Sequence, residues 1–163
     1  MSGLRPIPSG PPGSGSPWPA ADIIGVSPAG GSLEVRLGEL EHPVLLAFLA
    51  TRCDGCGEFW RGLRDDATLD LLESEPESEP VRVVAVTRGP ETISSADVCE
   101  VAAGVERVPV IMSDTAWSDY RVSGYPFFVL VDVRARRVAG ETVGFGWPDV
   151  VSMVRAATGA DEI

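Results

Sequence analysis

Hydrophobic and polar positions near the start of the chain predict a β-hairpin. From Ser32 to Leu37, apolar residues alternate with Glu34 and Arg36, which is typical of a strand with one buried face. The Gly30-Gly31 pair before this segment is a turn signal, so residues 23–26 are expected to pair with it. The continuous apolar run at 44–50 instead predicts a central strand covered on both faces.

A helical spacing follows this run. Between residues 57 and 72, apolar residues recur at steps of three and four, which predicts one continuous helix. The residues expected to face the core are Phe59, Trp60, Leu63, Ala67 and Leu71. Residues 73–80 hold four glutamates and two prolines and predict a solvated loop.

The rest of the chain predicts further strands and helices in alternation. Strands are expected at 81–86, 108–112, 127–131 and 137–143, and helices at 95–103, 116–120 and 148–158. Strands that alternate with helices in the first half predict parallel pairing, whereas the last two strands predict an antiparallel edge hairpin. The expected fold class is α/β, with a central mixed β-sheet sandwiched by helices and an N-terminal β-hairpin extension.

The N-terminal residues differ in composition from the rest of the chain. Residues 1–20 are rich in Pro, Gly and Ser and predict a flexible tail, so residues 21–163 are expected to form one domain. The first residues lack the apolar stretch of a signal peptide. The apolar runs at 44–50 and 127–131 are far shorter than a membrane-spanning helix, so no span is expected in this chain.

Charge and cysteine content narrow the function classes. The formal net charge is −11, and an acidic chain repels phosphate backbones, so nucleic acid is not an expected partner. Three cysteines are too few for a small disulfide-stapled scaffold. Two of them form a Cys-x-x-Cys motif at positions 53–56.

The motif follows the predicted central strand and opens the predicted helix. Two intervening residues let both sulfurs meet at the first helical turn, whose N–H groups and dipole stabilise a thiolate. We therefore expect a lowered pKa for the Cys53 thiol, which makes it the nucleophile, with Cys56 as the resolving thiol. Arg52 is expected to lower this pKa further, and Asp54 to oppose that effect.

Other chemistries for these cysteines have weaker support. Structural zinc takes four ligands, and only Cys99 and the single histidine, His42, remain besides the motif, so no metal site is expected. A Cys–His nucleophile pair would need His42 near Cys53, but these residues flank the strand at 44–50 at opposite ends, roughly 20 Å apart. An inert Cys-x-x-Cys is the remaining structural alternative.

Cys99 lies in a predicted helix. The expected role is that of a small buried hydrophobic residue. The alternatives are a third redox thiol or a site of intermolecular pairing.

Four parts of the sequence carry a resemblance to a known family. They are the strand and short loop at 33–40, the strand and motif at 43–56 (PVLLAFLATRCDGC), the segment at 122–132 (VSGYPFFVLVD), and the closing part with Gly140 and a terminal helix. Over roughly residues 22–158, the chain resembles the thioredoxin superfamily, and most closely its TlpA/ResA-like branch of bacterial thiol–disulfide oxidoreductases.

The resemblance implies roles for specific residues. Pro126 would be the cis-proline that faces the two sulfurs, and Tyr125 would present backbone N–H and C=O groups to an extended substrate. An ordinary trans-proline at the start of a strand is the alternative. Glu58 would assist proton transfer from the buried thiol, or would simply be an acidic residue favoured in a first helical turn. Gly55 completes the motif.

The resemblance also implies partners and location. It predicts an enzyme that acts on protein thiols and disulfides without a bound cofactor, together with an unidentified electron donor or acceptor. The family's domains are typically extracytoplasmic and often tethered, and this one is expected to be a monomer.

The chain departs from the family pattern at several positions. Arg52 stands where thioredoxins usually carry Trp, the intervening pair is Asp-Gly without a proline, and Trp60 lies near the place of a missing helix proline. Tyr125 is bulky for the residue before the cis-proline. These departures are expected to shift the reduction potential and the partner surface, so the direction of electron transfer stays open.

Two other functions compete with disulfide exchange. A peroxiredoxin-like peroxidase would share the fold, but its Pro-x-x-x-Thr-x-x-Cys pattern is absent at 46–53. A non-enzymatic adaptor or metal-delivery module is the second alternative. Copper delivery would need an added His or Met near the motif, and the sequence places none there.

Overall fold

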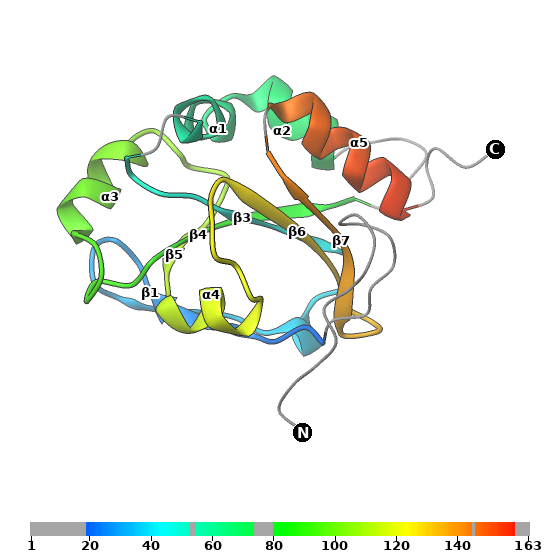
Figure 1. Cartoon of the computed structure of the whole chain (residues 1–163), viewed down its shortest axis with the longest axis horizontal. Helices are drawn as coiled ribbons and strands as arrows, with labels where there is room; N and C mark the ends of the chain where they lie inside the picture. Colours follow the sequence, from blue (N-terminus) through cyan, green and yellow to red (C-terminus); the bar gives the residue numbers. More distant parts are fainter. Residues whose placement is uncertain (1–18, 53–54, 74–79, 145, 159–163) are drawn as a thin grey trace.

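The computed structural model describes residues 19–52, 55–73, 80–144 and 146–158 (Figure 1). The strands are β1 (Ile23–Val26), β2 (Ser32–Val35), β3 (Val44–Phe48), β4 (Arg82–Thr87), β5 (Val110–Met112), β6 (Phe127–Asp132) and β7 (Arg137–Val143). The helices are α1 (Cys56–Leu63), α2 (Asp66–Glu73), α3 (Ser95–Val101), α4 (Asp114–Asp119) and α5 (Trp147–Thr158), with a short 3-10 turn at Leu37–Glu39.

The strands form one seven-stranded mixed sheet. Their order is β2-β1-β5-β4-β3-β6-β7. β3, β4 and β5 are parallel, whereas β6 and β7 form an antiparallel hairpin at one edge and β1 and β2 form another at the opposite edge. The predicted α/β class, the mixed sheet and the N-terminal hairpin are therefore confirmed.

Helices cover both faces of the sheet, which explains the continuous apolar run of β3. Figure 1 shows α1, α2 and α5 on one face and α4 on the other. Leu45 and Ala47 pack into the cluster that holds α1, α2 and α5, and Leu46 and Phe48 pack into the cluster that holds α4. Because successive side chains of a strand point to opposite faces, a strand between two helical layers has no exposed position.

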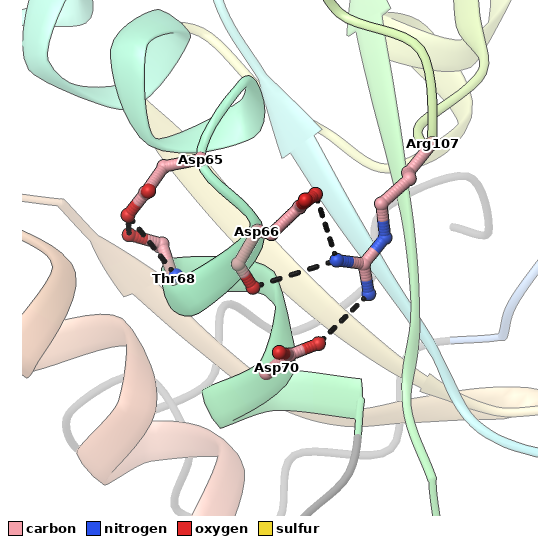
Figure 2. Close-up of polar contacts among 5 residues, drawn as sticks. All are labelled: Asp65, Asp66, Thr68, Asp70 and Arg107. Carbon is pink, nitrogen blue, oxygen red and sulfur yellow. Dashed lines mark hydrogen bonds and ion pairs between the residues drawn. The ribbon is translucent and has the colours of Figure 1, made fainter.

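The predicted single helix at 57–72 is wrong, because α1 ends at Leu63 and α2 starts at Asp66. Asp65 breaks the helix by capping the second one: its carboxylate accepts hydrogen bonds from the Thr68 hydroxyl at 2.7 Å and the Thr68 N–H at 3.2 Å (Figure 2). Both bonds hold the pKa of Asp65 below its usual range, and the bond from the Thr68 hydroxyl contributes more than the bond from the Thr68 N–H.

The break rotates the buried face of α2. Leu69 and Leu72 enter the core, whereas Leu71, which the uninterrupted spacing predicts as buried, is 53% exposed. Ala67 is exposed as well. Because α2 starts as a new helix, its buried positions do not continue the spacing of α1. A prediction that assumes one uninterrupted helix with 3.6 residues per turn therefore misplaces its buried face.

Arg107 ties α2 to the segment before β5. Figure 2 shows its guanidinium reaching two carboxylates on α2: Nη1 lies 3.1 Å from Asp66 Oδ1, and Nη2 lies 3.1 Å from Asp70 Oδ1. Both aspartates are largely exposed, so the pairs fix geometry more than they add stability.

Hydrogen bonds from the α4 layer fasten the N-terminal segment to the domain. The Tyr120 hydroxyl donates to the Ala21 carbonyl and accepts from the Ala21 N–H at 2.9 Å. Burial raises the pKa of Tyr120 to about 12. The buried Ser113 hydroxyl donates to the Ile24 carbonyl at 2.7 Å. These bonds give the polar groups of the docked backbone their partners.

The predicted tail and acidic loop fall mainly outside the described residues, at 1–18 and 74–79. The tail boundary stays a prediction. Within the described part, Pro19 forms a bridge with Arg137, and the Ala20 N–H donates to the Arg136 carbonyl at 3.0 Å. No helix in the described part of the chain is long and apolar enough to cross a membrane.

Candidate functional site

The start of α1 is fixed to the end of the central strand through Ala50. The Ala50 N–H donates to Cys56 Sγ at 3.5 Å, and the Trp60 indole N–H donates to the Ala50 carbonyl at 3.0 Å. One peptide segment therefore positions both the sulfur and the next turn of the helix. Cys56 is 1% exposed and is disulfide-bonded.

The first cysteine of the motif lies outside the described residues, as does Asp54. The roles expected for Cys53 and Asp54 therefore stay predictions. Gly55 and Cys56 are described, and they place the second half of the motif at the N-terminal end of α1. This location agrees with the expected strand-to-helix context.

An aromatic cluster holds α1 against the sheet and α5. Phe59 packs against Phe128 and Trp147, with ring centroids 4.7 Å and 5.0 Å apart. The Trp147 indole N–H donates to the Glu58 carbonyl at 3.4 Å. The close approach of the indole requires a residue without a side chain at Gly62 on α1, where a Cβ atom would lie 2.0 Å from Trp147 Nε1. The orientation of the helix that carries Cys56 therefore depends on this cluster.

The loop before β6 lies against the motif. The Tyr125–Pro126 peptide bond is cis. A Cβ atom built on Gly55 would lie 3.6 Å from both Cγ and Cδ of Pro126, which is ordinary van der Waals contact. The Pro126 carbonyl accepts from the Gly144 N–H at 3.1 Å, so the end of β7 supports this loop. Gly55 and Pro126, which are 71 positions apart in the sequence, thus meet at the motif.

Tyr125 itself projects from this loop. Its side chain is 49% exposed, and its ring stands edge-on to the buried Trp117 at a centroid distance of 6.0 Å. It lines a groove of about 620 Å³, together with the segment from Leu49 to Arg52 and residues of the β4–α3 connection and α3. An exposed aromatic residue beside the motif offers contact area to a partner.

The groove contains two arginines, of which the sequence analysis singled out Arg52 alone. Arg52 Nη2 lies 3.7 Å from Asp97 Oδ2. Arg88 lies directly after β4, and its guanidinium carbon is 4.5 Å from the centroid of the Trp117 ring. Because β3 and β4 are parallel, residues after their carboxyl ends share one edge of the sheet, and this rule could have marked Arg88 as a neighbour of the motif.

Glu58 is exposed in the first turn of α1. Its carboxylate lies near Gly146 in the connection between β7 and α5, because a Cβ atom on Gly146 would be 3.5 Å from Glu58 Oε2. Its position in the first turn suits the dipole role, and the proton-transfer role stays a prediction.

The expectation that Cys99 is buried is wrong. Cys99 lies on α3 as predicted, but its thiol is free and exposed. The core-facing position of this short helix is taken by Val98, which is 0% exposed, and the next residue points about 100° away on a helix of 3.6 residues per turn.

His42 lies just before β3, whereas the motif follows the other end of that strand. It lines a separate pocket with Arg82 and Pro109. Within the described residues, no group of three or more His, Cys, Asp or Glu side chains is arranged to hold a metal ion.

Solved structures share this fold, although no family model and no curated protein matches the chain. A thiol:disulfide interchange protein from Bacteroides sp. is 15% identical, with a TM-score of 0.61 over 92% of this chain and 94% of that chain. A thiol:disulfide interchange protein of the thioredoxin family from Chlorobium tepidum TLS is 19% identical, with a TM-score of 0.59 over 88% and 98%.

A third similar structure is BsSco, a member of the Sco family of cytochrome c oxidase assembly proteins. It is 15% identical, with a TM-score of 0.57 over 90% of this chain and 96% of that chain. The similarities define a thioredoxin-like fold, like that of the thiol:disulfide interchange proteins. At these identities they describe the fold alone.

Proposed function

We propose that the protein catalyses thiol–disulfide exchange on protein substrates, with Cys53 as the nucleophile and Cys56 as the resolving thiol. The observation that carries this proposal is the environment of Cys56: a buried, disulfide-bonded sulfur at the first turn of α1, within 3.5 Å of a backbone N–H. The disulfide partner in this proposal is Cys53, because Cys99 is a free thiol.

The reaction is a pair of sulfur displacements. The Cys53 thiolate attacks one sulfur of the partner's disulfide, so a mixed disulfide forms and the partner's other sulfur leaves as a thiolate. The Cys56 thiol loses its proton and attacks the Cys53 sulfur, which closes the internal disulfide and releases the partner's second thiolate. The protein dithiol is oxidised by two electrons and the partner disulfide is reduced by two. The reverse sequence oxidises a partner dithiol.

We assign distinct parts of this cycle to residues in and around the motif. The Ala50 N–H bonds to the Cys56 sulfur and stabilises negative charge as that thiol is deprotonated. In the proposed complex, the backbone of Tyr125 pairs with an extended partner segment, and Pro126 lies beside the attacking sulfur. Arg52 favours the Cys53 thiolate, Asp54 opposes it, and Glu58 serves as a proton acceptor for Cys56.

The expected setting follows the same reasoning. The proposed enzyme needs no bound cofactor, acts as a monomer and exchanges electrons with a separate protein donor or acceptor. An extracytoplasmic location, tethered or not, suits disulfide chemistry, because thiols in the cytosol are kept reduced.

The test is thiol trapping of the purified protein across a dithiothreitol or glutathione redox series. We expect a reversible two-electron transition that is lost in Cys53→Ser and Cys56→Ser and retained in the matched control Cys99→Ser. Reduction of insulin disulfides by the same proteins should fall to background in Cys53→Ser. A transition that requires Cys99, or no transition at all, contradicts the proposal. Partner binding without exchange would favour the adaptor role.

A further inference from the structure

The groove beside Tyr125 has a charge balance opposite to that of the whole chain. Among the described residues that line it, the charged side chains are Arg52, Arg88 and Asp97. The full chain has a formal net charge of −11. A ligand in this groove of about 620 Å³ therefore meets two guanidinium groups, and Asp97 is the one acidic side chain among the described lining residues.

The guanidinium of Arg88 is positioned by its neighbours but keeps hydrogen-bond donors that a ligand can use. Its guanidinium lies over the Trp117 ring, at 4.5 Å, and its Nη1 is 3.7 Å from Asp114 Oδ1. The Thr92 hydroxyl donates to the other Asp114 oxygen at 2.8 Å, which fixes that carboxylate. Because direct charge-assisted hydrogen bonds are about 2.7–2.9 Å long, the 3.7 Å contact orients Arg88 and leaves donors for a ligand.

Arg52 is the more exposed of the two groups. Its side chain is 83% exposed, and its contact with Asp97 is also 3.7 Å long. It directly precedes Cys53 in the sequence. Arg52 and Arg88 line the same groove, so a carboxylate bound there can meet two guanidinium groups, whose planar donor fork matches carboxylate geometry.

We propose that this groove selects extended partner segments that carry an acidic side chain next to the disulfide cysteine, and that Arg88 determines this specificity. The proposal rests on the exchange function proposed above and names its substrate class. Tyr125, which lines the same groove, contacts the bound segment as well. The charge complementarity favours an acidic partner segment over a basic or neutral one.

The experiment uses three synthetic peptides with an internal disulfide, which differ only in having Glu, Gln or Lys next to one cysteine. The rate constant for their reduction by the reduced full-length protein is measured at low and high salt. We expect the Glu peptide to react about tenfold faster than the Lys peptide at low salt, and less so at high salt, since partly exposed charge pairs are screened. The Glu-to-Lys rate ratio should fall several-fold in Arg88→Gln and in Arg52→Gln.

The matched control is Arg82→Gln, which removes the same charge from the opposite end of β4 and should keep the ratio. Arg88→Glu should invert the preference toward the Lys peptide, and this gain cannot result from misfolding. If wild type shows no charge preference, or if Arg82→Gln lowers the ratio as much as Arg88→Gln, the proposal is wrong. A response confined to glutathione disulfide would also overturn it. If wild type reduces none of the peptides, including the Gln peptide, the exchange function itself has failed.

Discussion

Two glycines on α1 have opposite surroundings and should respond in opposite ways to the same substitution. A Cβ atom at Gly62 would lie 2.0 Å from Nε1 and 2.5 Å from Cε2 of Trp147. A Cβ atom at Gly57 would meet only Arg61 Nη1, at 3.8 Å, which is an ordinary contact. Gly57→Ala is therefore a matched control for Gly62→Ala on the same helix.

The magnitudes follow from helix propensity and packing. In a helix interior, Ala is favoured over Gly by up to about 1 kcal/mol, and Gly57→Ala should gain part of this. At Gly62 the same gain is opposed by overpacking, which costs about 1–3 kcal/mol. Trp147 cannot move away easily, because its ring packs against Phe59 at 5.0 Å and Phe128 at 5.8 Å. We expect Gly62→Ala to be about 2 kcal/mol less stable than Gly57→Ala.

Urea unfolding followed by far-UV circular dichroism measures this difference directly. For a domain of this size, about 2 kcal/mol corresponds to roughly 4–8 °C between the melting temperatures of the two variants. The m-values should agree, since neither change alters the surface exposed on unfolding. If Gly62→Ala is as stable as Gly57→Ala, the indole does not constrain α1, and its role in orienting Cys56 must be abandoned.

Three further perturbations test contacts elsewhere. The pKa of Tyr120 is raised to about 12 from an ordinary value of 10, so the stability that its neutral hydroxyl provides is complete below pH 10 and declines as the pH rises toward 12. Wild type should lose about 2 kcal/mol between pH 10 and pH 12 and Tyr120→Phe should not, which urea titrations at those two pH values will show; equal losses refute the assignment. Trp60→Phe removes the hydrogen bond from the indole N–H to the Ala50 carbonyl. The Trp117 indole N–H has no hydrogen-bond partner among the described residues, so Trp117→Phe removes no such bond. Trp60→Phe should therefore lower the free energy of unfolding by about 1 kcal/mol more than Trp117→Phe in the same assay. Arg107→Gln should cost less than about 1 kcal/mol, and less still in high salt, because its ion pairs are exposed; a larger, salt-independent loss would contradict this.

The sequence predicts those parts of the fold that depend on local periodicity. The alternation from Ser32 to Leu37 and the continuous run at 44–50 report directly which faces are buried, and each contains a strand of the sheet, β2 and β3, that ends two residues before the predicted end. The break between α1 and α2 could not be predicted, because it depends on Asp65 capping a new helix and on Arg107 binding that helix from more than 30 residues away. Periodicity carries no information about such contacts.

In the candidate site, too, some features could be predicted from the sequence and others could not. The location of Cys56 at the start of a helix follows from the local pattern. The exposure of Cys99 was missed because two adjacent helix positions, 98 and 99, compete for one buried face. Arg88 was missed because the sequence predicts parallel pairing in this half of the chain but does not show that β3 and β4 are direct neighbours in the sheet. Tertiary neighbours of a motif require the topology, whereas the motif itself does not.

The position of β3 has a consequence for how the domain opens. β3 is paired along its whole length with β4 on one side and β6 on the other, and the Leu49 N–H still bonds to Val86 at 3.1 Å. We therefore expect the amide protons of this strand to exchange with solvent through opening of the sheet rather than through local fraying. Ala50 directly follows this segment and bonds to both Cys56 and Trp60. The start of α1 is thus attached to the part of the sheet that is expected to open last.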